Sequence, residues 1–206
     1  MVNQSGLFWT NLSSTVKFDY YSFPGAASNL FYLWKDLGRG SKGRVFLACN
    51  SKGKACAAKF FLLDQSLLHR KEDSSAEART TERERQMKLR KEAADLECSR
   101  WIEAYDGEFS KQVRVVKRCN LWCLLMPYFD SVRKDERVSF LPSVKTILSS
   151  FKTKSSLRYS DDDLRWRHIG MRDGRVFLFD LGSLEADDDK KPDIDEQIEQ
   201  LKTKIN

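Results

Sequence analysis

A run of three glycines, Gly38, Gly40 and Gly43, constrains the fold of this chain more than any other feature. The spacing Gly-x-Gly-x-x-Gly serves two kinds of phosphate site, and the flanking residues decide between them. In a dinucleotide-binding domain, the run joins a strand to a helix N-terminus. Here strand-like residues flank it on both sides, and turn residues lead to a third apolar run. The pattern therefore predicts strands at 31–37, 44–49 and 55–61, with a glycine flap whose backbone N–H groups can cover phosphates.

A single lysine, Lys59, stands near the end of the third predicted strand. We expect it to be the counter-charge for phosphates held under the glycine flap.

One long helix is predicted next. Ser74 and Glu77 have the spacing of a capping box, and helix formers continue to Tyr105. The first half is too charged to bury a face, which is typical of a solvated helix. In the second half, Glu97 has mostly apolar neighbours three and four positions away, so we expect it to point inward, where a carboxylate needs a partner. Glu92 is the less buried alternative.

Two further apolar runs, 112–117 and 121–129, predict strands that complete a sheet of about five. Met126-Pro127-Tyr128 marks the exit from this sheet, because Pro127 cannot donate to a central ladder. A polar linker and a modest helix over 138–151 follow.

Acidic residues bracket a predicted hairpin in the last third of the chain. Asp163 precedes it, Asp173-Gly174 is a strong hairpin signal, and the strand at 175–179 leads to Asp180. Carboxylates that flank a tight hairpin converge in space. Beside a phosphate cradle, they indicate a site for a nucleotide with Mg²⁺.

Composition excludes several other classes of protein. No apolar run approaches the roughly 20 residues that span a bilayer, and the first 30 residues lack the pattern of a signal peptide. Five cysteines without a Cys-x-x-Cys pair, and only two histidines, favour a reducing compartment over a zinc or disulfide framework. The net charge of +6 suits nucleotides or acidic partners, but no basic cluster carries interleaved aromatics, so nucleic acid is not an expected partner.

Taken in order, these motifs resemble a protein kinase over roughly residues 33–182. The resemblance implies that ATP and Mg²⁺ are the cofactors. It gives Asp163 the catalytic role and makes Lys59, held by Glu97, the residue that binds the α- and β-phosphates. Asp180-Leu181-Gly182 is similar to the Asp-Phe-Gly motif, so Asp180 would bind the metal, and His168 stands where the family has its metal-binding asparagine. The residues implied to bind the nucleotide are Gly38, Gly40, Gly43, Val45, Lys59, Glu97, Met126 and Tyr128.

Finer features resemble the divergent kinase-like C-terminal domains of Crinkler-type effectors of oomycetes and fungi. These features are an Asp-Leu-x-Trp-Arg-His loop starting at Asp163, a compact region before it, and few residues after Asp180. Two departures from the kinase pattern bear on activity: Asp161-Asp162 replaces the usual His-Arg, and His168 replaces an amide. A neutral imidazole is a poorer Mg²⁺ ligand than a carbonyl oxygen, and the alternative for His168 is a structural histidine packed by Trp166.

We therefore expect an α+β, protein-kinase-like fold. Residues 1–30 would be an extension of unknown role, 31–129 an N-lobe with a five-stranded antiparallel sheet and one long helix, and 130–206 a reduced, mainly helical C-lobe. The expected function is transfer of the ATP γ-phosphate to a protein hydroxyl or to the protein itself, in the cytoplasm or nucleus, including those of a host cell. The alternatives are a pseudokinase that acts as a nucleotide-binding scaffold, and a small-molecule phosphotransferase.

Overall fold

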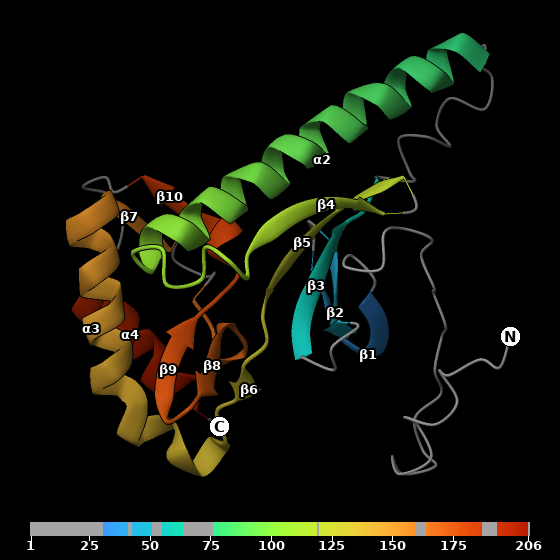
Figure 1. Ribbon diagram of the computed structural model, residues 1–206. Helices are drawn as coiled ribbons and strands as arrows, with labels where there is room; N and C mark the ends of the chain where they lie inside the picture. The colour runs from blue at the N-terminus through green and yellow to red at the C-terminus, as the bar shows by residue number, and fades with distance from the viewer. Residues whose placement is uncertain are drawn as a thin grey trace, which may run out of the picture.

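The computed structural model describes residues 31–40, 43–50, 55–63, 76–118, 120–159, 164–186 and 193–205. It is an α+β protein in which a five-stranded antiparallel sheet and a long helix, α2 (Ala76–Ala104), adjoin a second part with two shorter helices and two small sheets (Figure 1). The predicted extension over residues 1–30 lies outside the described residues.

The large sheet has the order β1-β2-β3-β5-β4, and every neighbouring pair is antiparallel. The predicted sheet of about five strands is confirmed. Its strands are β1 (Phe31–Gly40), β2 (Gly43–Asn50), β3 (Ala55–Phe61), β4 (Arg114–Arg118) and β5 (Leu121–Pro127). The strand predicted over 121–129 ends at Pro127, whose ring nitrogen has no proton to donate.

The glycine run belongs to the β1–β2 hairpin itself. Gly38 and Gly40 lie within β1, and Gly40 pairs with Gly43, so the strand predicted to end at residue 37 continues to residue 40. Gly38 has a φ of +149°, a value that side chains disfavour. At Gly43, a Cβ would lie 2.1 Å from the backbone oxygen of Phe60, so only glycine lets β2 pack this closely on β3.

An ion pair braces this hairpin on its exposed side. The Asp36 carboxylate accepts hydrogen bonds from Arg44 Nε at 2.8 Å and from the Gly38 backbone N–H at 3.0 Å. The hydrogen bond from Arg44 holds the pKa of Asp36 below its usual value. The brace joins the two strands on either side of the glycine turn.

Helix α2 runs the length of the molecule, across β4 and β5 and on to the second part (Figure 1). Most side chains of its first half are exposed, as predicted, but Glu82 and Gln86 are buried, which corrects the expectation that this half buries no face. A carboxylate tolerates burial when its oxygens are bonded, and Glu82 accepts from Arg85 and Gln86. Within the described ranges, no helix is long and apolar enough to cross a membrane.

The second part of the chain begins after β5. Helix α3 is longer than the predicted 138–151, because the helix continues to Ser155 and ends only where Ser156 adopts a left-handed conformation. The predicted hairpin at Asp173-Gly174 is confirmed, with φ values of +52° and +73° at its two turn residues. The elements are β6 (Asp130–Ser131), α3 (Arg137–Ser155), β7 (Leu157–Tyr159), β8 (Ile169–Arg172), β9 (Arg175–Leu178), β10 (Leu184–Ala186) and α4 (Ile194–Thr203).

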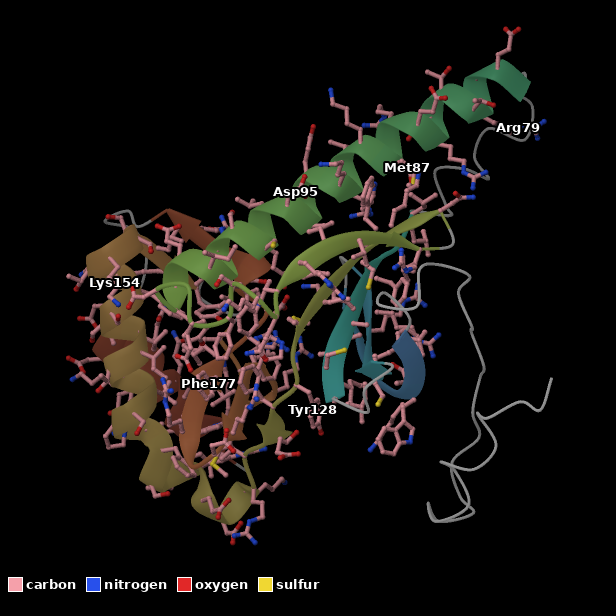
Figure 2. All side chains as sticks on the ribbon, viewed as in Figure 1. Arg79, Met87, Asp95, Tyr128, Lys154 and Phe177 are labelled. Carbon is pink, nitrogen blue, oxygen red and sulfur yellow. The ribbon has the colours of Figure 1, made fainter. Side chains whose placement is uncertain are left out.

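A continuous hydrophobic core joins the sheet, α2 and the second part. At its centre, aromatic rings from α2, the turn after it, the segment after β5 and β9 are in contact; they are Trp101, Tyr105, Phe109, Phe129 and Phe177. Figure 2 shows Phe177 inside this crowded region, whereas Arg79 lies at the far, projecting end of α2. The Tyr105 hydroxyl both donates to the Leu178 carbonyl and accepts from its N–H, at 2.6 and 2.8 Å. The end of α2 is therefore fixed to the end of β9.

Candidate functional site

The candidate site lies where β3, α2 and the segment after β9 meet. The side chain of Lys59 on β3 is only 7% exposed, and the Lys59 ammonium lies 5.6 Å from the centre of the Phe61 ring. A charged group is rarely buried unless it is paired. The partners of Lys59 therefore define the site.

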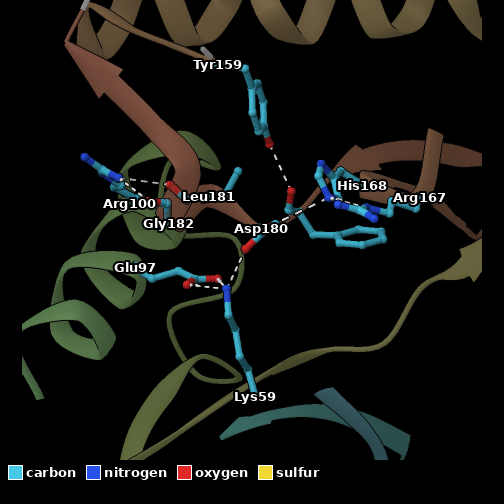
Figure 3. Close-up of polar contacts among 10 residues, drawn as sticks. Lys59, Glu97, Arg100, Tyr159, Arg167, His168, Asp180, Leu181 and Gly182 are labelled. Atoms are coloured by element: carbon cyan, nitrogen blue, oxygen red, sulfur yellow. Dashed lines mark hydrogen bonds and ion pairs between the residues drawn. The ribbon is translucent and has the colours of Figure 1, made fainter. Parts of the chain in front are cut away.

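Lys59 binds two carboxylates that are far apart in the sequence (Figure 3). Its Nζ donates to both oxygens of Glu97, at 3.0 and 2.8 Å, and to Oδ1 of Asp180 at 2.5 Å. Glu97 is fully buried, whereas the Asp180 side chain is 32% exposed. An ammonium has three N–H donors, so these contacts use all of them.

The charges of the two carboxylates keep Lys59 protonated. Burial by itself lowers the pKa of Lys59, but the nearby charges of Glu97 and Asp180 and their hydrogen bonds outweigh burial and place the pKa above its usual value. The ion pair therefore persists throughout the neutral pH range.

Asp180 has a special backbone conformation, with φ +61° and ψ +43°. Aspartate is among the residues that adopt this left-handed region most readily, but it does so at a cost in free energy that the surroundings must offset. Two side chains hold the adjacent carbonyls. Arg100 of α2 donates to the carbonyls of Leu181 and Gly182, at 3.2 and 3.1 Å, and the Tyr159 hydroxyl donates to that of Phe179 at 3.0 Å.

Gly182 has to be glycine because Glu97 occupies the space beside it. A Cβ at this position would lie 2.5 Å from Oε2 of Glu97, the oxygen that receives the shorter bond from Lys59. The Asp-Leu-Gly motif thus provides a carboxylate for Lys59 at its first residue and room for the partner of Lys59 at its third.

We expect Gly182→Ala to reduce the free energy of unfolding by about 1–3 kcal/mol, because the added methyl group forces Glu97 off Lys59 in a packed site. Urea denaturation measures the effect. The matched control is Gly40→Ala, whose Cβ would meet no atom within 4 Å. If the two variants are equally stable, the steric argument is wrong.

The sheet aligns several of the predicted nucleotide-binding residues with Lys59. One cross-strand row runs from Gly38 to Val45 and on to Lys59. Because side chains two apart on a strand share a face, Met126, the β5 partner of Ala57, lies on the same face as Lys59. Tyr128 follows β5 and is partly exposed, and Gly40 lies at the hairpin end of β1.

His168 lies on the other side of Asp180. It ends a short 3-10 helix (Trp166–His168), is buried, and places Nε2 3.8 Å from Oδ2 of Asp180. The same Nε2 accepts a hydrogen bond from Nε of Arg167 at 3.1 Å. The structure thus brings Lys59, Glu97, Asp180 and His168 together, as the sequence analysis predicts. Asp163 lies outside the described residues.

The possible ligand atoms differ in how well they suit Mg²⁺. A carboxylate is a preferred ligand, and in the partly exposed Asp180, Lys59 binds Oδ1, while Oδ2 lies 3.8 Å from Nε2 of His168. Nε2 of His168 is a poor metal ligand here, since its lone pair already accepts a hydrogen bond from Arg167. No group of three or more His, Cys, Asp or Glu side chains among the described residues is placed to hold a metal ion.

Sequence reasoning missed three residues that shape the site. Arg100 looked like an interruption of an apolar helix face, and nothing local assigns Tyr159 or Arg167 a role. Burial lowers the pKa of Arg100, although nearby Glu97 acts in the opposite direction. Arg100 and Tyr159 act through contacts with residues far away in the sequence, whereas Arg167 contacts its sequence neighbour His168.

The fold and site together define an α+β protein with a buried lysine held between two carboxylates. The chain belongs to the family described as "Family of unknown function (DUF5898)", whose profile matches residues 36–172, well over half of the chain. The matched segment contains Lys59, Glu97 and His168, and Asp180 follows it. No curated protein matches the chain.

Proposed function

We propose that the protein is an ATP-dependent phosphotransferase with a protein-kinase-like fold, and that it transfers the γ-phosphate to a protein hydroxyl or to itself. The observation that carries this proposal is the bridge from Lys59 to both Glu97 and Asp180. This bridge joins three residues that the kinase resemblance assigns to the nucleotide site, which lie on β3, on α2 and in the segment after β9. In this proposal the five-stranded sheet and α2 form the N-lobe, and residues 130–206 form a reduced C-lobe.

The proposed chemistry assigns each residue a task. The backbone of the β1–β2 hairpin covers the phosphates, and the apolar face with Val45 and Met126 receives the adenine. Lys59 binds the α- and β-phosphates while Glu97 orients it, and Asp163 orients or deprotonates the attacking hydroxyl. Asp180 would hold Mg²⁺, which when bound neutralises phosphate charge.

Nucleotide binding requires an exchange at Lys59. Its three N–H donors are all engaged, so a phosphate oxygen must replace one of the carboxylate contacts. The bond to Asp180 is the one to exchange, because Asp180 is partly exposed and can be solvated, whereas Glu97 is fully buried and loses more when its bonds to Lys59 are broken.

Incubation with labelled Mg-ATP and a mixture of protein substrates tests the proposal, and the protein's own labelling is measured in parallel. We expect phosphate incorporation in the wild-type protein and its loss in Lys59→Met and Asp163→Ala. Lys91→Met is the matched control, because Lys91 is half-exposed and contacts its helix neighbour Asp95 and the Trp122 ring, outside the proposed site. Equal labelling in wild type and both site variants contradicts transfer at this site.

A second candidate function, a nucleotide-binding pseudokinase, is favoured by the state of His168. The residue at the expected metal-binding position has its ring nitrogen engaged by Arg167, which argues for weak or absent turnover. This alternative predicts stabilisation by ATP, of roughly 2.7 kcal/mol at a ligand concentration 100-fold above Kd, without phosphate transfer. A panel of metabolites in place of the protein substrates tests for a small-molecule acceptor.

A further inference from the structure

Arg167 lies next to the two residues to which the kinase resemblance assigns the metals. Its Nε donates to Nε2 of His168 at 3.1 Å, and that nitrogen is 3.8 Å from Oδ2 of Asp180 (Figure 3). An arginine side chain is a donor only, so Nε2 is the acceptor in this hydrogen bond and its lone pair faces the Arg167 N–H. The lone pair that would bind a metal is therefore the one that Arg167 uses.

A divalent cation at His168 would have to displace Arg167 and would then lie close to its positive charge. The guanidinium is always protonated, so this repulsion cannot be relieved by loss of a proton. The ring nitrogen of His168 therefore does not fit a metal ion, in contrast to the Asp180 carboxylate. The positive charge of Arg167 beside it suits an anion instead.

The backbone on either side of Arg167 is fixed. Trp166 is buried and its indole N–H donates to the Leu201 carbonyl at 2.9 Å, while His168 is buried beside Asp180. Between these two anchors, the side chain of Arg167 is exposed. Within the described part of the chain, Arg167 makes a single hydrogen bond, through Nε, and this bond uses neither of its two terminal nitrogens.

We propose that Arg167 binds the terminal phosphate of a nucleoside triphosphate and replaces a second divalent cation at this site. The inference rests on the proposed function, since it places the triphosphate between Lys59 and Arg167, on opposite sides of the Asp180 carboxylate. A guanidinium presents two parallel N–H groups to a phosphate, which gives both charge and orientation. His168 is then a positioning residue that holds Arg167 through Nε.

Calorimetric titration with ATP and ADP, each with Mg²⁺, tests the proposal. We expect the wild-type protein to prefer ATP, and Arg167→Met to bind ATP about 10- to 100-fold more weakly while its affinity for ADP is unchanged. Arg167→Lys keeps the charge but loses the paired N–H groups, so its ATP affinity should be intermediate. Arg83→Met, which removes an exposed arginine from the projecting half of α2, is the control for net charge.

A metal count gives a readout independent of turnover. We expect electron paramagnetic resonance to detect one bound Mn²⁺ per chain when ATP is present. If the wild-type protein binds ATP with two Mn²⁺ ions, or if Arg167→Met binds ATP as tightly as wild type, the role of Arg167 is overturned and the phosphotransferase proposal stands. If wild type binds neither nucleotide, both proposals are overturned.

Discussion

Replacement of Lys59 by methionine is expected to lower the free energy of unfolding by about 3–5 kcal/mol. The substitution removes the ammonium that donates to both oxygens of the fully buried Glu97, and the loss of such a charge from a buried carboxylate is costly. Chemical denaturation with urea measures the difference. Because the folded-state pKa of Lys59 lies above the unfolded value of about 10.4, its contribution is complete at neutral pH and is lost only as pH rises through the folded-state pKa.

Two further variants separate the charge effect from the loss of a side chain. Lys91→Met removes a lysine from a half-exposed pair and should change stability by no more than about 1 kcal/mol. The double variant Lys59→Met/Glu97→Leu removes both charges and should recover much of the loss, since apolar replacement of a buried pair is often neutral. A double variant that is less stable than Lys59→Met would contradict this account.

Replacement of Leu201 by alanine is expected to cost about 2–5 kcal/mol, because the side chain is fully buried where α4 packs on the second part of the molecule. The backbone carbonyl of Leu201, which the alanine variant keeps, accepts the indole N–H of Trp166, and Trp166 precedes Arg167. We expect the cavity to loosen α4 and thereby this hydrogen bond, so that ATP affinity falls along with stability. Thermal unfolding with and without nucleotide measures both effects.

The matched control for Leu201→Ala is Leu96→Ala, which makes the same chemical change on a helix. Leu96 is 50% exposed, so its truncation leaves no cavity, and alanine is a slightly better helix former. We expect a change within about 0.5 kcal/mol. Similar losses for both variants would show that α4 does not contribute to the core.

The parts of the fold that could be predicted are those with a local signal. Alternating apolar runs and turn residues predicted the strands, and Asp173-Gly174 predicted the hairpin. The apolar neighbours of Glu97 indicated its burial and its need for a partner, whereas the choice of Lys59 as that partner came from the kinase resemblance. The strands, the hairpin and the burial of Glu97 agree with the structure because each depends on residues that are neighbours along the chain or on one helix face.

The contacts of two site residues could be found only in the tertiary structure, whereas helix α4 has a pattern in its own sequence. The contacts of Arg100 and Tyr159 with backbone carbonyls join residues up to 82 positions apart, and no local pattern encodes them. Helix α4, by contrast, has apolar residues at Ile194, Ile198 and Leu201, and Asp193 caps its N-terminus by accepting from the Glu196 N–H. That pattern is typical of an amphipathic helix.

Helix α2 holds three parts of the site through residues on successive turns. Glu97 binds β3 through Lys59, Arg100 binds the carbonyls after Asp180, and Tyr105, just past the helix end, binds the end of β9. These residues span about 12 Å along the axis, and a helix is stiff over such a length. A shift of α2 must therefore change all three contacts together, and a displacement of its projecting end would be transmitted along the helix to the site.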